Sequence, residues 1–449
     1  MKKDHHQPLW VYLLFCLLSV VLMHSCRSEL DTDRDGISDD KDKCVEKKGP
    51  KPDGCPLPPK IGKINLYLET SASMGGYFAG ASEFKTIISD LAVKLDKEIS
   101  PVSIHFIADT IRNYHATATR FSSDIATTKV AMARSSELHH IFDKIAKSTR
   151  NSDISILVSD CILSFPNAAV KANPEINKQS ASGTLKNNIY STFVDLKKRG
   201  QSASLYAFSS KFFGRYYTYQ NVNLKLKGQL RPFYIWIIGK KNVLPVFDAK
   251  LSLIPNFHPE QTLHFGALEE KIEHYRILTQ LDKNSPYKLI SGSKASSDLG
   301  IEELDLPESK SARFSAVVDL TNLPPYARSI KYLRENLKLT AKGCDAKVEI
   351  TPRPFIALKN KKQMTYLEQS SHLFRVTVSS LRLDMASVQL TLPLKYDKWY
   401  QQWSTMDDKN IAKLEKKTFA FEHLVEGAKE AYNNADKNFI DLKFQINRN

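Results

Sequence analysis

The chain has 449 residues, of which 42% are hydrophobic and 25% charged, and its formal net charge is +15. This length and apolar content suffice for two or three globular domains. The basic residues are dispersed, which argues against nucleic acid as a partner, so the charge favours either an anionic envelope surface or a plain solvated one.

The N-terminus has the form of an export signal. Lys2 and Lys3 precede an apolar run from Leu9 to Met23, which is shorter than the roughly 20 residues of a membrane-spanning helix. The run ends at Met23-His24-Ser25-Cys26, which resembles a bacterial lipobox. The resemblance implies that residues 1–25 are a lipoprotein signal peptide and that Cys26 carries a lipid anchor. An uncleaved N-terminal anchor is the alternative.

An acidic twelve-residue loop follows. Gly36 stands at its sixth position and Ile37, whose carbonyl would bind, at its seventh, and its carboxylates are Asp31, Asp33, Asp35, Asp39 and Asp42. This is the oxygen pattern of an EF-hand-type calcium loop. Residues 31–56 resemble a thrombospondin type 3 repeat, which implies a calcium-binding stalk over residues 26–60. An acidic linker without metal is the alternative.

The cysteines fit an exported chain. Cys44 and Cys55 lie close together in sequence, so we expect a disulfide in an oxidising compartment. Cys161 and Cys344 each sit in or beside a strand-like run and are expected to be buried thiols. Three prolines after Cys55 predict an extended linker: Pro56, Pro58 and Pro59.

Strands and helices alternate between residues 61 and 255. We expect strands at 64–68, 102–108, 154–158, 204–208 and 233–238, and helices at 83–97, 137–147, 186–198 and 242–251. This alternation predicts an α/β domain with a doubly wound, mostly parallel sheet. Ligands in such sheets bind at the carboxyl ends of the strands.

Two of these strand ends carry hydroxyls and carboxylates. The first strand ends in Glu69-Thr-Ser71-Ala-Ser73-Met74, and the central strand ends in Ser159-Asp160. The pattern resembles a von Willebrand factor type A domain, whose metal-ion-dependent adhesion site (MIDAS) reads Asp-x-Ser-x-Ser. The resemblance covers residues 60–255 and assigns Ser135 or Ser136 to the Thr of that family and Asp160 to its later Asp.

The resemblance implies a divalent metal held by oxygens. The ligands would be Glu69, Ser71, Ser73, Ser135 or Ser136, and Asp160, and a set of oxygens and waters suits magnesium or manganese. Glu69 departs from the family, because it is one methylene longer than the usual Asp. A degenerate site, whose hydroxyls only cap the following helices, is the alternative.

The sequence offers no catalytic arrangement, so we do not expect an enzyme. His139 and His140 are adjacent on a predicted helix, where neighbouring residues do not share a face, so they are not expected to bind a metal together. The serines after the first strand lack a Gly-x-Ser-x-Gly elbow, and no Gly-Lys-Ser/Thr phosphate loop is present.

In residues 256–449 the hydrophobic pattern changes to a period of two. We expect a β-rich domain, an immunoglobulin-like sandwich, with strands at 312–320, 337–341, 346–351, 373–378 and 388–394 and a helix at 419–432. The segment with Trp399 and Trp403 either forms a binding edge or packs domains together, and Phe439 to Ile446 is expected to be a last strand.

These features predict a lipid-anchored protein of the bacterial cell envelope, on either side of the outer membrane. It would bind a protein or glycan partner through the MIDAS-like site, with calcium in the stalk and magnesium or manganese in the head. The alternative is a metal-free structural or assembly protein of the envelope.

Overall fold

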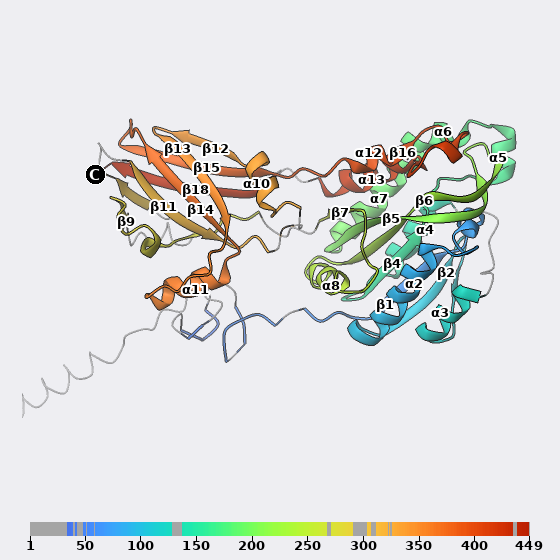
Figure 1. Cartoon of the computed structure of the whole chain (residues 1–449), viewed down its shortest axis with the longest axis horizontal. Helices are drawn as coiled ribbons and strands as arrows, with labels where there is room; N and C mark the ends of the chain where they lie inside the picture. Colours follow the sequence, from blue (N-terminus) through green and yellow to red (C-terminus); the bar gives the residue numbers. More distant parts are fainter. Residues whose placement is uncertain are drawn as a thin grey trace, which may run out of the picture. The chain divides into compact units, whose positions relative to one another are not determined.

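The computed structural model describes residues 34–38, 41–42, 48–50, 52–57, 59–127, 137–266, 271–290, 303–306, 311–321, 323, 326–433 and 438–448 (Figure 1). The chain forms two compact units, residues 1–58 and residues 59–449, which are described separately below.

The second unit contains a seven-stranded sheet with the order β3-β2-β1-β4-β6-β5-β7. Its central strands form because apolar residues run without interruption, so that both faces of the strand can be buried. The seven strands are β1 (Ile64–Glu69), β2 (Val102–Ile107), β3 (Ile111–Asn113), β4 (Ile154–Ser159), β5 (Gln201–Tyr217), β6 (Asn223–Lys240) and β7 (Gln261–Phe265).

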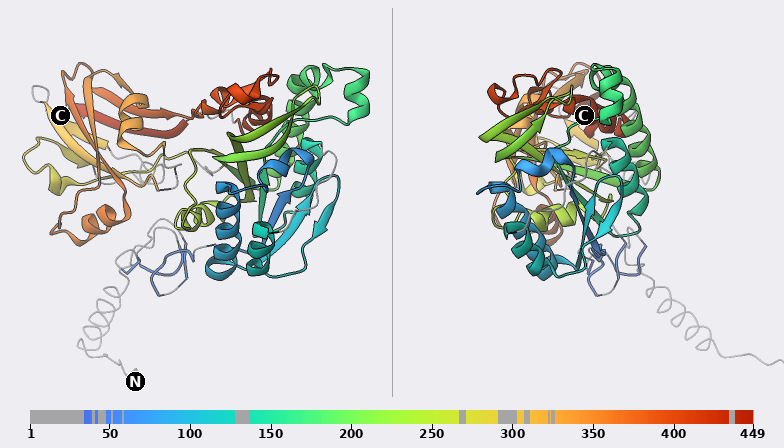
Figure 2. Two further views of the ribbon diagram at one scale, coloured as in Figure 1. Left: turned by 45° about the vertical axis from the view of Figure 1, so that its right-hand side comes forward. Right: turned by 90° about the vertical axis from the view of Figure 1, so that its right-hand side faces the viewer.

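Helices cover both faces of this sheet. One face packs on α2 (Glu83–Lys94, extended by η2, Leu95–Ile99), α3 (Ala118–Thr127) and α8 (Leu244–Leu251). The other face packs on α4 (Leu138–Ser148), the η3 turn (Ala181–Leu185) and α7 (Lys186–Lys198). Figure 2 shows α2 in blue and α7 in green on opposite sides of the strands. The α/β architecture with helices on both faces is therefore confirmed.

The expectation of a mostly parallel sheet is wrong. β1 pairs in parallel with β2 and β4, but β4–β6, β6–β5, β5–β7 and β2–β3 are antiparallel. The reason is a long hairpin, because β5 turns directly into β6 without a crossover helix. The hairpin extends past the end of β4, since Ser159 faces Tyr234 while β6 begins at Asn223. The sheet is mixed, and it includes β7, which lies beyond residue 255.

The segment after residue 398 also belongs to the α/β part. It contains α12 (Trp399–Gln402), β16 (Ser404–Thr405), η5 (Ile411–Lys413), β17 (Thr418–Phe419) and α13 (Phe421–Tyr432). α13 packs beside α7 in the same apolar cluster as Trp236. Trp399 and Trp403 are buried in this cluster, and the indole of Trp399 donates to the carbonyl of Thr262 at 3.1 Å. The Trp pair therefore packs against the α/β sheet and forms no exposed binding edge.

The remaining strands form a β-sandwich. Its five-stranded sheet has the order β12-β15-β18-β10-β9, and its four-stranded sheet has the order β13-β14-β11-β8. The strands are β8 (Arg276–Ile277), β9 (Lys288–Ile290), β10 (Glu303–Leu306), β11 (Ala312–Val318), β12 (Lys338–Lys342), β13 (Asp345–Pro352), β14 (His372–Ser379), β15 (Met385–Pro393) and β18 (Asn438–Arg448).

The two sheets of the sandwich share one apolar core. Phe314 and Val376 from one sheet lie with Val388 and Phe444 from the other, and the rings of Phe314 and Phe444 are 5.1 Å apart. β10 and β18 are parallel, which differs from the antiparallel sheets of an immunoglobulin domain. Connecting helices are α5 (Asn167–Ala172), α6 (Ile176–Ser180), α10 (Ile330–Asn336) and α11 (Lys361–Gln369), with a short turn η4 (Thr279–Leu281).

The first unit is described only in part. Gly36 has a φ of +90°, a conformation that favours glycine and supports the sharp turn expected at this position. Asp35 accepts backbone hydrogen bonds from Ile37 at 2.9 Å and from Gly49 at 3.0 Å. These bonds fold the acidic segment back on the residues that follow it.

Candidate functional site

The carboxyl ends of β1 and β4 lie side by side. The two strands are parallel, with Leu68 opposite Val158, so Glu69 and Ser159 end the strands next to each other. The 3-10 helix η1 (Ala72–Gly76) begins directly after β1. The topology therefore brings together Glu69, Ser71, Ser73 and Asp160, as the sequence predicts. Ser135 and Ser136 lie outside the described residues.

Short hydrogen bonds organise this edge. The hydroxyl of Ser159 donates to Oε2 of Glu69 and accepts the N–H of Cys161 at 2.8 Å. Oδ1 of Asp160 accepts the N–H of Ile162 at 3.1 Å. The hydroxyls of Ser71 and Ser73 are 2.9 Å apart. The side chains of the predicted ligands at this edge thus all present oxygens, which are the ligands that hard divalent cations prefer.

The two carboxyl groups are buried together. Asp160 is 1% exposed and Glu69 is 4% exposed. Burial, followed by repulsion from Glu69, raises the pKa of Asp160 from 3.8 to about 7. Oδ2 of Asp160 is buried and makes no hydrogen bond among the described residues. This edge therefore carries an acceptor and negative charge that protein groups only partly compensate.

One cation of the chain reaches this edge. Arg231, on the part of β6 that extends past β4, is buried and lowers the pKa of Asp160. Its guanidinium lies 4.9 Å from the ring centre of Tyr216, and it donates to the carbonyl of Leu414 at 3.1 Å and to that of Lys417. The C-terminal segment therefore fixes the position of Arg231.

A buried aspartate ties the same segment to the hairpin. Asp408 accepts the hydroxyl of Tyr216 at 2.7 Å and the N–H of Tyr219 at 2.9 Å. The hydroxyl of Tyr234 donates to the hydroxyl of Thr418 at 3.1 Å. These contacts join positions about 190 residues apart, so sequence reasoning did not find them. The aromatic run from Phe212 to Tyr219 was the available signal for the hairpin.

The residues present fit a divalent cation. Two carboxylates and two hydroxyls converge on one edge, and one carboxylate oxygen there makes no hydrogen bond to the described residues. Glu69 is bound to Ser159 in this arrangement, so its extra methylene reaches the central strand. A cation would compensate the repulsion that raises the pKa of Asp160.

The stalk residues are only partly described. Asp35, Ile37 and Asp42 are described, and Ile37 and Asp42 are buried. Cys55 is in a disulfide, whereas Cys161 and Cys344 are buried free thiols. Several predicted residues lie outside the described residues: Cys26, Asp31, Asp33, Asp39 and Cys44. The pairing of Cys44 with Cys55 and the calcium ligands stay predictions.

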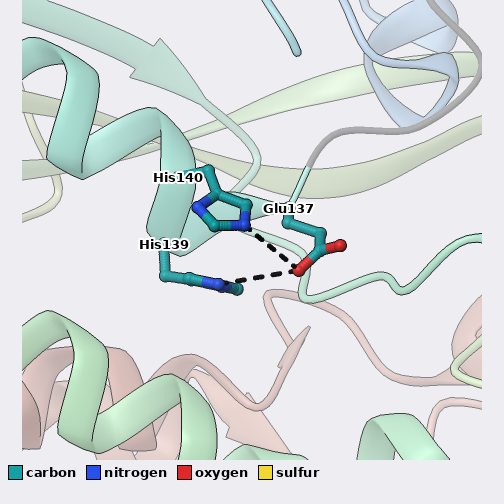
Figure 3. Close-up of side chains that lie close together, drawn as sticks. All are labelled: Glu137, His139 and His140. Carbon is teal, nitrogen blue, oxygen red and sulfur yellow. Dashed lines mark ion pairs between the residues drawn. The ribbon is translucent and has the colours of Figure 1, made fainter.

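A second group of ligand-type side chains lies at the start of α4. Oε2 of Glu137 is 3.6 Å from Nε2 of His139 and 3.7 Å from Nε2 of His140 (Figure 3). The ring centres of the two histidines are 4.2 Å apart, although adjacent helical residues were not expected to share a face. Glu137 is the N-cap residue, with extended backbone, so its side chain reaches across the first turn to both rings.

A buried polar cluster also joins α8 to the sheet. The hydroxyl of Ser204 contacts Oδ2 of Asp248 at 2.7 Å and Nδ1 of His264 at 2.9 Å. Ser204 is fully buried, and Asp248 and His264 both contact its hydroxyl. The cluster therefore ties strands to a helix and presents no nucleophile to a substrate.

Comparison with known proteins assigns no family to this chain. No model of a known protein family matches the chain, and no curated protein matches it significantly. No helix in the described part of the chain is long and apolar enough to cross a membrane.

Proposed function

We propose that this protein is a lipid-anchored envelope protein that binds a protein or glycan partner through a cation site on its α/β domain. The cation, magnesium or manganese, would be held by Glu69, Ser71, Ser73 and Asp160. The resemblance to von Willebrand factor type A domains adds Ser135 or Ser136. In this proposal the protein is a binding protein and not an enzyme.

The observation that carries the proposal is the buried carboxyl pair at the ends of β1 and β4. An ionised carboxylate in a buried position is costly unless a partner compensates its charge. Oδ2 of Asp160 makes no hydrogen bond in the described part of the chain, and Glu69 opposes its ionisation, which Ser73 and Arg231 only partly offset. A divalent cation supplies the missing compensation, with oxygen ligands of the preferred kind.

The burial of the edge constrains how a partner could reach it. Asp160 and Glu69 are almost inaccessible, and the segment that holds Arg231 lies beside them. A partner would therefore contact an ion coordinated at the margin of this edge, next to Ser73, which is the most exposed of the four proposed ligands. The stalk and the lipid would hold this surface away from the bilayer.

Arg231 supports a second candidate function, a metal-free scaffold for envelope assembly. Its buried guanidinium partly compensates Asp160, and two backbone carbonyls and an aromatic ring fix it. In this case the edge is a structural ion-pair network, and the sandwich makes the functional contacts.

Manganese binding separates the two candidates. The full chain is stripped with chelator and titrated with Mn²⁺, which is detected by its paramagnetic resonance. We expect stoichiometric binding that Asp160→Asn and Ser73→Ala weaken, whereas Asp195→Asn, at an exposed helical position, leaves it unchanged. Absence of bound Mn²⁺ in the wild-type chain would contradict the cation site and favour the scaffold. Affinity capture from envelope extracts, with and without chelator, then tests partner binding.

A further inference from the structure

The start of α4 carries a group of side chains that the proposed function does not use. Glu137, His139 and His140 each offer one ligand atom, and the three atoms lie within 4.8 Å of one another. Figure 3 shows both imidazole rings turned toward the carboxylate of Glu137. The ring centres of the two histidines are 4.2 Å apart, so their Nε2 atoms approach the carboxylate from neighbouring directions.

The spacing of these atoms fits a small tetrahedral ion. Zinc binds imidazole nitrogen and carboxylate oxygen at about 2.0–2.1 Å, so adjacent ligand atoms around it are about 3.3–3.4 Å apart. The carboxylate oxygen lies 3.6 Å and 3.7 Å from the two nitrogens, and all three ligand atoms lie within 4.8 Å of one another, so side-chain rotation has to draw them together to reach this value. Direct hydrogen bonds from either ring to Glu137 would need a shorter approach, of about 2.7–2.9 Å.

The three side chains differ in their exposure to solvent. His139 is 11% exposed, Glu137 27% and His140 61%. The cluster therefore combines one packed ligand, which gives it a fixed position, with one that faces solvent. Nδ1 of His139 is buried without a hydrogen-bond partner among the described residues, so the ring is held by packing and by Glu137.

One further carboxylate lies near these ligands. Asp143, one turn further along α4, acts electrostatically on His139 and also pairs with Lys147 at 2.6 Å.

We propose that Glu137, His139 and His140 form a binding site for a late transition-metal ion, zinc in particular. Two imidazoles and one carboxylate select zinc, copper or nickel over magnesium and calcium, which prefer oxygen alone. Three protein ligands leave the fourth tetrahedral position to water or to a side chain of a partner, as in zinc sites with an open position.

This site is separate in chemistry from the oxygen-lined edge at Glu69 and Asp160. The start of α4 nevertheless lies near the carboxyl end of β4. Leu138 shares an apolar cluster with Cys161 and Leu163, which follow Asp160. The protein would thus hold a hard cation and a borderline cation near one edge, with different ligands and independent affinities.

Zinc titration of the untagged full chain tests the proposal. Chelator-stripped protein is titrated with ZnCl₂ by calorimetry in excess Mg²⁺, and Co²⁺ is used as a spectroscopic probe of tetrahedral coordination. We expect the wild type to bind one zinc equivalent. His139→Ala and His140→Ala should each weaken zinc binding by at least roughly 10–100-fold, which is the effect of losing even an outer-shell partner. Glu137→Gln should weaken binding less than loss of either ring.

The control is His115→Ala, which removes an exposed histidine outside the cluster and should leave zinc affinity unchanged. His140→Ala is the decisive variant, because this ring is mostly exposed and its loss should not impair folding, which a thermal melt without metal verifies. Zinc affinity that is unchanged in His140→Ala and His139→Ala would overturn the proposal. So would zinc binding lost in Asp160→Asn but retained in His140→Ala, since the ion would then occupy the oxygen-lined edge.

Discussion

The substitution Asp160→Asn offers a quantitative test of the buried carboxyl pair. The raised pKa of Asp160 means that the folded protein binds this proton more tightly than the unfolded chain does. The associated stability is therefore fully present below pH 3.8 and is lost as the pH rises to about 7. Above that value, the difference between the two pKa values corresponds to a cost of about 4 kcal/mol.

Asparagine removes the ionisation and keeps the acceptor for the N–H of Ile162. Its amide adds a buried donor with no acceptor identified, which costs about 1–3 kcal/mol. In chelator at pH 8, Asp160→Asn should therefore be more stable than the wild type by about 1–3 kcal/mol. Between pH 5 and pH 8, its stability relative to the wild type should increase by about 2–3 kcal/mol.

The assay is urea denaturation of the full chain at several pH values, with chelator or with excess Mg²⁺. A cation that binds the folded wild type stabilises it by about 2.7 kcal/mol at a concentration one hundred times its Kd, and the variant should lack most of this gain. Asp195→Asn is the control for a change of net charge at an exposed position. A relative stability of Asp160→Asn that does not depend on pH would refute the reasoning.

Three further predictions concern packing and the stalk. Asp408→Asn should destabilise the protein by about 1–3 kcal/mol, because Asp408 accepts two buried hydrogen bonds from the hairpin, and urea denaturation measures this; a loss below about 0.5 kcal/mol would contradict it. Gly76→Ala should lower the free energy of unfolding by about 1–3 kcal/mol, because the new Cβ would lie 2.2 Å from the ring of Phe212. Gly75→Ala should be tolerated, because its Cβ would have nothing within 4 Å. Equal stabilities of these two variants would show that the hairpin does not press on η1. Calcium should protect the stalk of the full chain from trypsin cleavage at Lys41 and Lys48, and Asp35→Asn should reduce that protection. Cleavage rates that do not depend on calcium would argue for an acidic linker without metal.

Much of the α/β part was readable in the sequence because its signals are local. The apolar runs at β1 and β4 and the amphipathic periods of α2, α4 and α7 specify strands and helices within a few residues. The parallel orientation of β1 and β4 then follows from the helical connections between them, so Glu69 and Asp160 could be expected at one edge. Six sandwich strands, β11 to β15 and β18, were found in the same way, from their period of two, whereas the short strands β8, β9 and β10 were not predicted.

The length of the hairpin β5–β6 was underestimated, because its outer half lies past the neighbouring strand and buries only alternate residues. Phe212 and Tyr216 are buried there by η1 and by the C-terminal segment, which local periodicity does not reveal. The position of α13 beside α7 likewise depends on contacts across more than 200 residues.

The sequence by itself determined the element types, the oxygen-rich ends of two parallel strands and the acidic pattern of the stalk, because each depends on nearby residues. Only the tertiary structure decided the mixed sheet, the burial of Asp160 beside Arg231 and the meeting of Glu137 with two histidines. These features depend on how distant segments pack or on the backbone conformation of the residue that precedes a helix. A helical wheel places His139 and His140 on different faces, but the extended N-cap residue Glu137 brings one carboxylate to both.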